Sequence, residues 1–203
     1  LAAKARGLKY IAITDHSRAL AMANGLDEDR ALAHAKRVRE IGDRLDGITL
    51  LAGIECDIRP DGTMDLADDC LAQLDVVVAS VHSAFNQDAS QMTDRMLRAV
   101  ACRYVDIIGH PTGRLLLRRE PYKVDVNILI EAAAATGVAL TLNRPVTALT
   151  FAPEGAQLAS LTDDGELCLW DLWLLPWCTA HDIEGQTTVH DWLLTRLGVR
   201  EAL

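Results

Sequence analysis

Short apolar runs recur along the first 143 residues, and four of them stop at a side chain of the same chemical kind. The first run, Tyr10-Ile-Ala-Ile13, is followed after two polar residues by His16. Three later runs behave alike: residues 50–54 lead to Glu55, residues 76–81 to His82 and residues 105–109 to His110. Runs of this length that are rich in β-branched residues are typical of buried strands. The pattern therefore predicts four strands, each presenting an imidazole or a carboxylate at its carboxyl end.

Amphipathic segments lie between these runs. Asp27 is placed to cap a helix that extends to about Leu45, because the apolar positions that follow it keep helical spacing. Further helices are expected over residues 66–74, 87–101 and 126–136, the last ended by Gly137, and a fifth strand over residues 138–143. Strands that alternate with helices at this spacing form parallel sheets, and the active site of such folds gathers at the carboxyl ends of the strands. We therefore expect the four side chains to meet in one pocket.

The pattern changes after Arg144. Residues 146–172 contain short strand-like runs joined by tight turns with no helical segment between them, which predicts antiparallel sheet. Residues 173–203 contain three tryptophans and a predicted helix over residues 187–197, but the pattern indicates no role for them. The expected organisation is thus an α/β domain over residues 1–143, a β segment over residues 144–172 and a tail over residues 173–203.

Composition narrows the class of protein. The chain has 203 residues, half of them hydrophobic, which is enough for one sizeable core. A net charge of −9 argues against a generally basic nucleic-acid surface, although it leaves room for nucleic acid at a metal site. No apolar run approaches the ~18 residues of a membrane span. The five cysteines lack Cys-x-x-Cys spacing, which favours free thiols in the cytoplasm. The oligomeric state is not indicated.

The four strand-end side chains have the chemistry of a metal site. Imidazole and carboxylate suit Zn²⁺, Mn²⁺ and Fe²⁺ without choosing among them. Clustered cations of this kind activate water and hold a phosphate diester for attack, so no serine or cysteine nucleophile is required. The alternative is that the four are core polar residues that satisfy one another. Their common position at strand ends favours the metal interpretation.

A basic loop follows His110. It contains Arg114, Arg118, Arg119 and Lys123 in an otherwise acidic chain. Such a loop could contact a phosphate backbone, or it could be a solvated surface loop paired with Glu120, and the sequence leaves both interpretations open.

Six stretches carry a resemblance to a known family: residues 10–17, 23–28, 51–55, 76–83, 85–87 and 106–114. On them the first 143 residues resemble the polymerase and histidinol phosphatase (PHP) family of metal-dependent phosphoesterases, and most of all the nuclease domain of bacterial family X DNA polymerases. The resemblance implies a distorted seven-stranded α/β barrel that binds up to three divalent ions, Mn²⁺ or Zn²⁺. It also implies hydrolysis of phosphate esters, at a DNA 3′ end in the polymerase branch.

The resemblance also implies roles for individual residues. His16, Glu55, His82 and His110 match metal ligands of the family. Candidate catalytic residues are Asp15, as an orienting neighbour of His16, and Arg114. Candidate phosphate contacts are Arg114, Arg118 and Arg119.

The chain also departs from the family pattern. The family opens with a His-x-His strand and closes with an Asp-x-His strand, and neither is recognisable here, so an incomplete barrel is expected. Residues 146–172 resemble a single WD-repeat blade ending in Leu169-Trp-Asp-Leu172, which would form a short antiparallel C-terminal appendage.

Three functions follow as hypotheses. The first is a metal-dependent phosphoesterase of the 3′-5′ exonuclease type acting on DNA. The second keeps the hydrolase but gives it a small phosphomonoester, as in histidinol phosphatases. The third is an inactive remnant or binding module, which the missing ligand strands favour.

Overall fold

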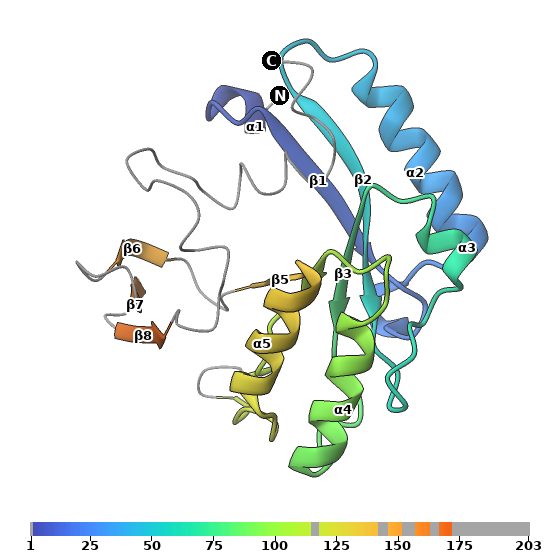
Figure 1. The fold of residues 1–203 in the computed structure, drawn as a ribbon. Coiled ribbons are helices and arrows are strands. Elements are labelled where there is room, and N and C mark those ends of the chain that lie inside the picture. Colours follow the sequence, from blue (N-terminus) through green and yellow to red (C-terminus); the bar gives the residue numbers. More distant parts are fainter. Residues whose placement is uncertain (1, 115–117, 142–145, 152–156, 163–166, 172–203) are drawn as a thin grey trace. The chain divides into compact units, whose positions relative to one another are not determined.

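A computed structural model describes residues 2–114, 118–141, 146–151, 157–162 and 167–171 of the chain (Figure 1). The chain divides into two compact units, Leu1–Pro145 and Val146–Leu203. Every candidate site residue belongs to the first unit.

The first unit is built on a parallel sheet of five strands. These are β1 (Tyr10–His16), β2 (Thr49–Asp57), β3 (Val76–Ser80), β4 (Ile107–Ile108) and β5 (Ala139–Leu140), paired in that order. All four pairings are parallel, which confirms the predicted α/β class with a parallel sheet. The last two strands are shorter than predicted. Closure of the sheet into a barrel is not a feature of the described strands and stays a prediction.

Helices α2 (Glu28–Gly42), α3 (Asp68–Leu71), α4 (Ala89–Val100) and α5 (Val126–Thr136) lie in the predicted intervals between these strands. The short helix α1 (Ala2–Ala5) precedes β1, and the 3₁₀ turn η1 (Ala21–Ala23) follows it. An aspartate begins each of the three long helices, since the carboxylates of Asp27, Asp88 and Asp125 accept hydrogen bonds from backbone N–H groups of the first turn. Gly137, with φ of 76°, ends α5 in the left-handed conformation that glycine adopts without strain.

The core lies between the sheet and its helices. Helix α4 contributes Met92 and Met96, both with no exposed surface, to a cluster that includes Ile54 of β2 and Val77 of β3. Helix α2 packs on β2 through a smaller cluster of Ala35, Val38 and Ala52. A membrane-crossing helix is absent from the described residues, where α2 is the longest helix with 15 residues and many charges.

Two aspartates tie the amino ends of neighbouring strands together. Asp75, directly before β3, accepts a hydrogen bond from the backbone N–H of Ala52 in β2 at 2.7 Å. Asp106, directly before β4, accepts one from the N–H of Val77 in β3 at 2.9 Å. Each carboxylate thus satisfies a donor of the adjacent strand. The strands are held in register at this edge, and their opposite, carboxyl ends are aligned as a consequence.

In the second unit the described residues form the strands β6 (Val146–Phe151), β7 (Gln157–Thr162) and β8 (Leu167–Asp171), which pair antiparallel in that order. The likeness of residues 146–172 to a WD-repeat blade stays a prediction. The helix predicted over residues 187–197 lies outside the described residues.

A buried arginine joins the segments that follow β2 and β3. Arg95 of α4 is only 1% exposed, and burial lowers its pKa. Its guanidinium donates to the carbonyl of Ile58 through two nitrogens, to the carbonyl of Ser83 at 3.0 Å and to the side-chain oxygen of Gln87 at 3.1 Å. Ile58 and Ser83 adjoin Asp57 and His82, so Arg95 sets the distance between these two segments.

Replacing Arg95 with Met is expected to lower the free energy of unfolding by about 3 kcal/mol, because two buried carbonyls lose a charged donor. Urea unfolding of the full chain, followed by circular dichroism, measures the change. Arg98→Met is the matched control, since Arg98 is an exposed residue of the same helix with one hydrogen bond, to the Asp61 carbonyl. The control should change stability by less than about 0.5 kcal/mol. Equal stability of the two variants would contradict the role of Arg95.

Candidate metal centre

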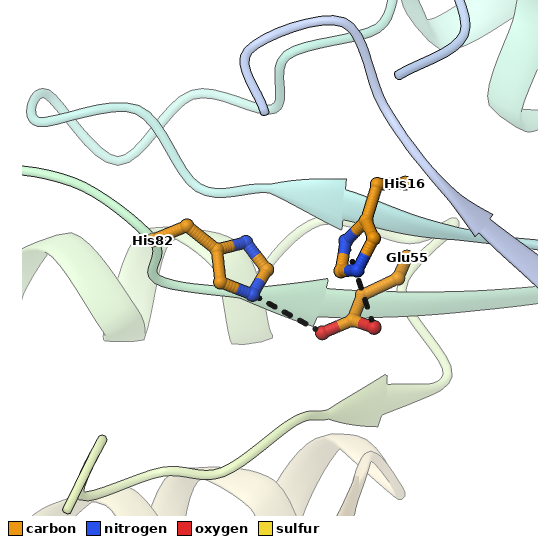
Figure 2. Close-up of side chains that lie close together, drawn as sticks. All are labelled: His16, Glu55 and His82. Atoms are coloured by element: carbon orange, nitrogen blue, oxygen red, sulfur yellow. Dashed lines mark ion pairs between the residues drawn. The ribbon is translucent and has the colours of Figure 1, made fainter. Parts of the chain in front are cut away.

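The carboxyl ends of the first four strands bring the four predicted metal ligands together. His16 is the last residue of β1 and lies directly opposite Glu55 of β2 in the parallel register. His82 follows the end of β3 by two residues, and His110 follows β4 by two. Figure 2 shows the His16 and His82 rings beside the Glu55 carboxylate, with a dashed line from each ring to a different carboxylate oxygen.

Glu55 is the centre of the cluster. Its Oε1 atom lies 3.1 Å from Nε2 of His110 and 3.3 Å from Nε2 of His82. Its Oε2 atom lies 3.8 Å from Nδ1 of His16. One carboxylate is therefore shared by three imidazoles, each delivered by a different strand.

The three rings crowd one another as well as the carboxylate. The His82 ring centroid lies 5.1 Å from that of His16 and 5.0 Å from that of His110. Ligand atoms of His16, Glu55 and His82 all lie within 4.8 Å of one another, a spacing that a single cation can span. His110 joins this group through the Glu55 oxygen that it shares with His82.

A buried ring nitrogen beside Glu55 makes these residues fit a cation. The Nδ1 atom of His16 lies 3.8 Å from the Oε2 atom of Glu55 and has no hydrogen-bond partner among the described residues. Buried polar atoms are normally paired, because an unpaired one loses its hydration without compensation. A divalent cation is a natural partner for an imidazole nitrogen beside a carboxylate. The cluster is therefore better explained as a set of ligands than as a self-satisfied polar core.

The electrostatics of the cluster also favour positive charge. Hydrogen bonds from His110 and then His82 hold the pKa of Glu55 well below its ordinary value, against the opposing effect of burial. Burial by itself would lower the pKa of His82, but hydrogen bonds with Asp57 and Glu55 outweigh it and raise that pKa to about 9. Glu55 is thus held as a carboxylate, and its surroundings attract either a proton or a metal ion.

Asp57 is part of the site although the sequence pattern assigned it no role. Its side chain is 4% exposed and accepts a hydrogen bond from Nδ1 of His82. The backbone N–H of Asp57 donates to the Ser17 hydroxyl at 2.9 Å. The signal that could have found it is the i, i+2 spacing, which places Glu55 and Asp57 on one face of β2.

His110 is held by its own loop. Its backbone N–H donates to the Thr141 hydroxyl at 2.7 Å, and its carbonyl accepts from the Gly113 N–H at 2.8 Å and from the Tyr122 hydroxyl at 3.2 Å. Its φ of 32° is unusual for a residue with a side chain. Gly109 before it lies against the Ser80 hydroxyl, where a Cβ atom would collide. The loop is therefore fixed on both sides of the imidazole.

The structure does not bring Asp15 to the cluster. Successive strand residues point to opposite faces, so the residue before His16 faces away from it. The carboxylate of Asp15 is 54% exposed and pairs with Nδ1 of His34 on α2 at 2.8 Å. This position offers no contact with the other candidate residues, and the catalytic role of Asp15 stays a prediction without structural support.

The arginines of the basic loop differ in how far they are buried. Arg114 and Arg118 are exposed. Arg119 is half-buried, with its Nε donating to the Gly113 carbonyl at 2.9 Å and its guanidinium 4.0 Å from the centre of the Phe85 ring. Arg119 thus anchors the loop, and the phosphate contacts expected of the three arginines stay predictions.

Comparison with known proteins found relatives of two kinds. The chain is 46% identical over 138 residues to the DNA polymerase/3′-5′ exonuclease PolX of Bacillus subtilis, an alignment that covers 68% of this chain and 24% of the relative. It is 35% identical over 144 residues to a probable phosphatase of Shewanella baltica and 33% identical to a probable phosphatase of Shewanella oneidensis. Both alignments cover 70% of this chain and 52% of the relative. No family model matches the chain.

The chain therefore spans about a quarter of the polymerase and about half of the phosphatases that it matches. Both kinds of relative support the likeness to PHP-type phosphoesterases. Neither supports the likeness of residues 146–172 to a WD-repeat blade.

Replacing Glu55 with Gln is expected to lower bound transition metal per purified chain at least about tenfold, since the variant removes the negative charge that three imidazoles share. Elemental analysis of the full chain measures the change. Glu40→Gln is the matched control, because Glu40 lies on the surface of α2 opposite Lys36 at 4.0 Å. Unchanged metal content in Glu55→Gln, or a wild-type chain without metal, would contradict the site.

Proposed function

We propose that the chain is a metal-dependent phosphoesterase whose metal centre consists of His16, Glu55, His82 and His110. The observation that carries the proposal is the sharing of one carboxylate, Glu55, by three imidazoles, of which His16 directs at it a buried nitrogen without a hydrogen-bond partner among the described residues. The names of the relatives point to the same class of reaction, since one is an exonuclease and the others are probable phosphatases.

The described residues divide the chemical work between binding and orientation. His16 and the Oε2 side of Glu55 would hold a cation on one side, and His82, His110 and the Oε1 side would hold it, or a second one, on the other. A bound divalent cation supplies Lewis-acid chemistry, polarising a phosphoryl oxygen and making water a better nucleophile. Asp57 orients His82, and the loop contacts of Thr141, Gly113 and Tyr122 orient His110.

A DNA 3′ end is the substrate that we favour. The relative with 46% identity is named for a 3′-5′ exonuclease, and the alignment covers most of this chain. The exposed side chains of Arg114 and Arg118 lie in the loop that begins at His110 and supply positive charge beside the metal centre. Basic side chains of this kind position a phosphate backbone without reading its sequence. On this proposal residues 1–143 form the phosphoesterase domain.

A small phosphomonoester is the second candidate. The probable phosphatases share 33–35% identity over a similar length of this chain, and a cation site that polarises one phosphoryl oxygen serves monoesters and diesters alike. The two substrate classes differ in the space and the charge that the site must provide around the leaving group.

The test is Mn²⁺-dependent release of nucleotides from the 3′ end of single-stranded DNA, compared with phosphate release from histidinol phosphate. His82→Ala is expected to lower the rate on the preferred substrate by more than about a hundredfold. The loss of a metal ligand should reduce the rate more than the loss of a residue that only orients a ligand. The matched control is His34→Ala, because His34 pairs with Asp15 away from the cluster. The control should leave the rate unchanged.

Each outcome of this comparison selects one hypothesis. Faster turnover of DNA supports the exonuclease, and faster turnover of the monoester supports the phosphatase. Hydrolysis that survives His82→Ala, or no hydrolysis of either substrate by wild-type chain with bound metal, contradicts the proposed function and favours an inactive or binding role.

A further inference from the structure

Asp57 is unusual among the buried residues because a carboxylate is rarely buried away from solvent. Its residue is 3% exposed, whereas the Asp15 carboxylate in the adjacent strand is 54% exposed. A buried negative charge requires partners that compensate for its lost hydration. The hydrogen bond from Nδ1 of His82 supplies one, and the nearby positive charge of Arg95 supplies a second, longer-range one.

This hydrogen bond determines which nitrogen of His82 faces the cluster. An imidazole has two ring nitrogens, and the one that carries the hydrogen bonded to a carboxylate cannot also bind a cation. With Nδ1 donating to Asp57, Nε2 is the nitrogen directed at Glu55, 3.3 Å from its Oε1 atom. His110 also faces Glu55 through Nε2, but its Nδ1 is buried without a hydrogen-bond partner among the described residues, and His16 faces Glu55 through Nδ1 itself.

Asp57 is itself fixed by contacts from several segments. Its N–H donates to the hydroxyl of Ser17, the residue after His16, at 2.9 Å. Its carbonyl accepts from the N–H of Asp65 at 2.9 Å, and its residue pairs with Ser80 in the sheet. These contacts fix the backbone of Asp57, and with it the position from which its carboxylate reaches His82.

We infer that Asp57 is a positioning residue of the metal centre, which holds His82 with Nδ1–H toward its own carboxylate and Nε2 toward the cation. The inference rests on the proposed function where it concerns metal affinity. The orientation of His82 can be measured without metal. Carboxylates behind metal-binding histidines fix the ring and raise its basicity, and their loss commonly weakens metal binding 10–100-fold.

The first arm of the test measures the affinity of the full chain for Zn²⁺ by competition with a chromophoric chelator. Asp57→Asn keeps the shape and removes the charge, and it is expected to weaken binding by about 10–100-fold. The matched control is Asp61→Asn, because Asp61 is an exposed aspartate after β2 whose carboxylate accepts a hydrogen bond from Thr63, and this variant should bind as the wild type does. Equal Zn²⁺ affinity of Asp57→Asn and the wild type would overturn the inference.

The second arm uses metal-free wild-type chain labelled with ¹⁵N at histidine. A downfield proton on Nδ1 that is protected from exchange and absent from His82→Ala is expected, because a charge-assisted hydrogen bond to a buried carboxylate protects it. The proton should exchange faster in Asp57→Asn. Its absence from the wild type would overturn the inference even if Asp57→Asn did not fold. If the protected proton is present but wild-type chain binds no Zn²⁺, the orientation stands and the proposed function fails.

Discussion

Parallel pairing of β1, β2 and β3 in one register is the constraint on which the candidate site depends. The pairing sets His16 directly opposite Glu55 and Asp57 opposite Ser80, two residues before His82. Because side chains alternate along a strand, a slip of one residue would turn the carboxylates of β2 away from the imidazoles. Asp75 supports the pairing of β2 with β3 by binding the N–H of Ala52, and Asp106 supports the pairing of β3 with β4 by binding the N–H of Val77.

Buried charge is balanced around the site in layers. Glu55 is compensated by imidazoles, Asp57 by His82 and, at longer range, by Arg95, and Arg95 by carbonyls of the segments that follow β2 and β3. Each of these charge pairings also holds two segments of the chain together, because the groups that neutralise one another belong to different segments. Removing one partner leaves the other charged and buried, which is more costly than removing both. Stability and the geometry of the centre are therefore coupled.

The site and the comparisons agree on the class of chemistry and leave the substrate to experiment. Three imidazoles around a carboxylate suit a divalent cation, and the relatives are named for a nuclease and for phosphatases. The surroundings of the centre, and above all the loop after His110, would determine which phosphate ester is bound. In that loop Arg119 contacts Phe85 and the Gly113 carbonyl, whereas the side chains of Arg114 and Arg118 are exposed.

Local pattern was sufficient to predict the order of strands and helices, the parallel sheet and the meeting of four side chains at its edge. It succeeded because apolar periodicity, aspartate caps and Gly137 act within a few residues of where they stand. It could not assign Asp57 to His82, Asp15 to His34 or Arg119 to Phe85. These pairs are separated by 19 or more residues, and each depends on which face of a strand or loop is turned inward by packing. Asp15 and Asp57 are alike as sequence, each an acid at the end of an apolar strand. Burial distinguishes them in the folded chain, where Asp15 forms a surface ion pair with His34 and Asp57 is a buried partner of His82.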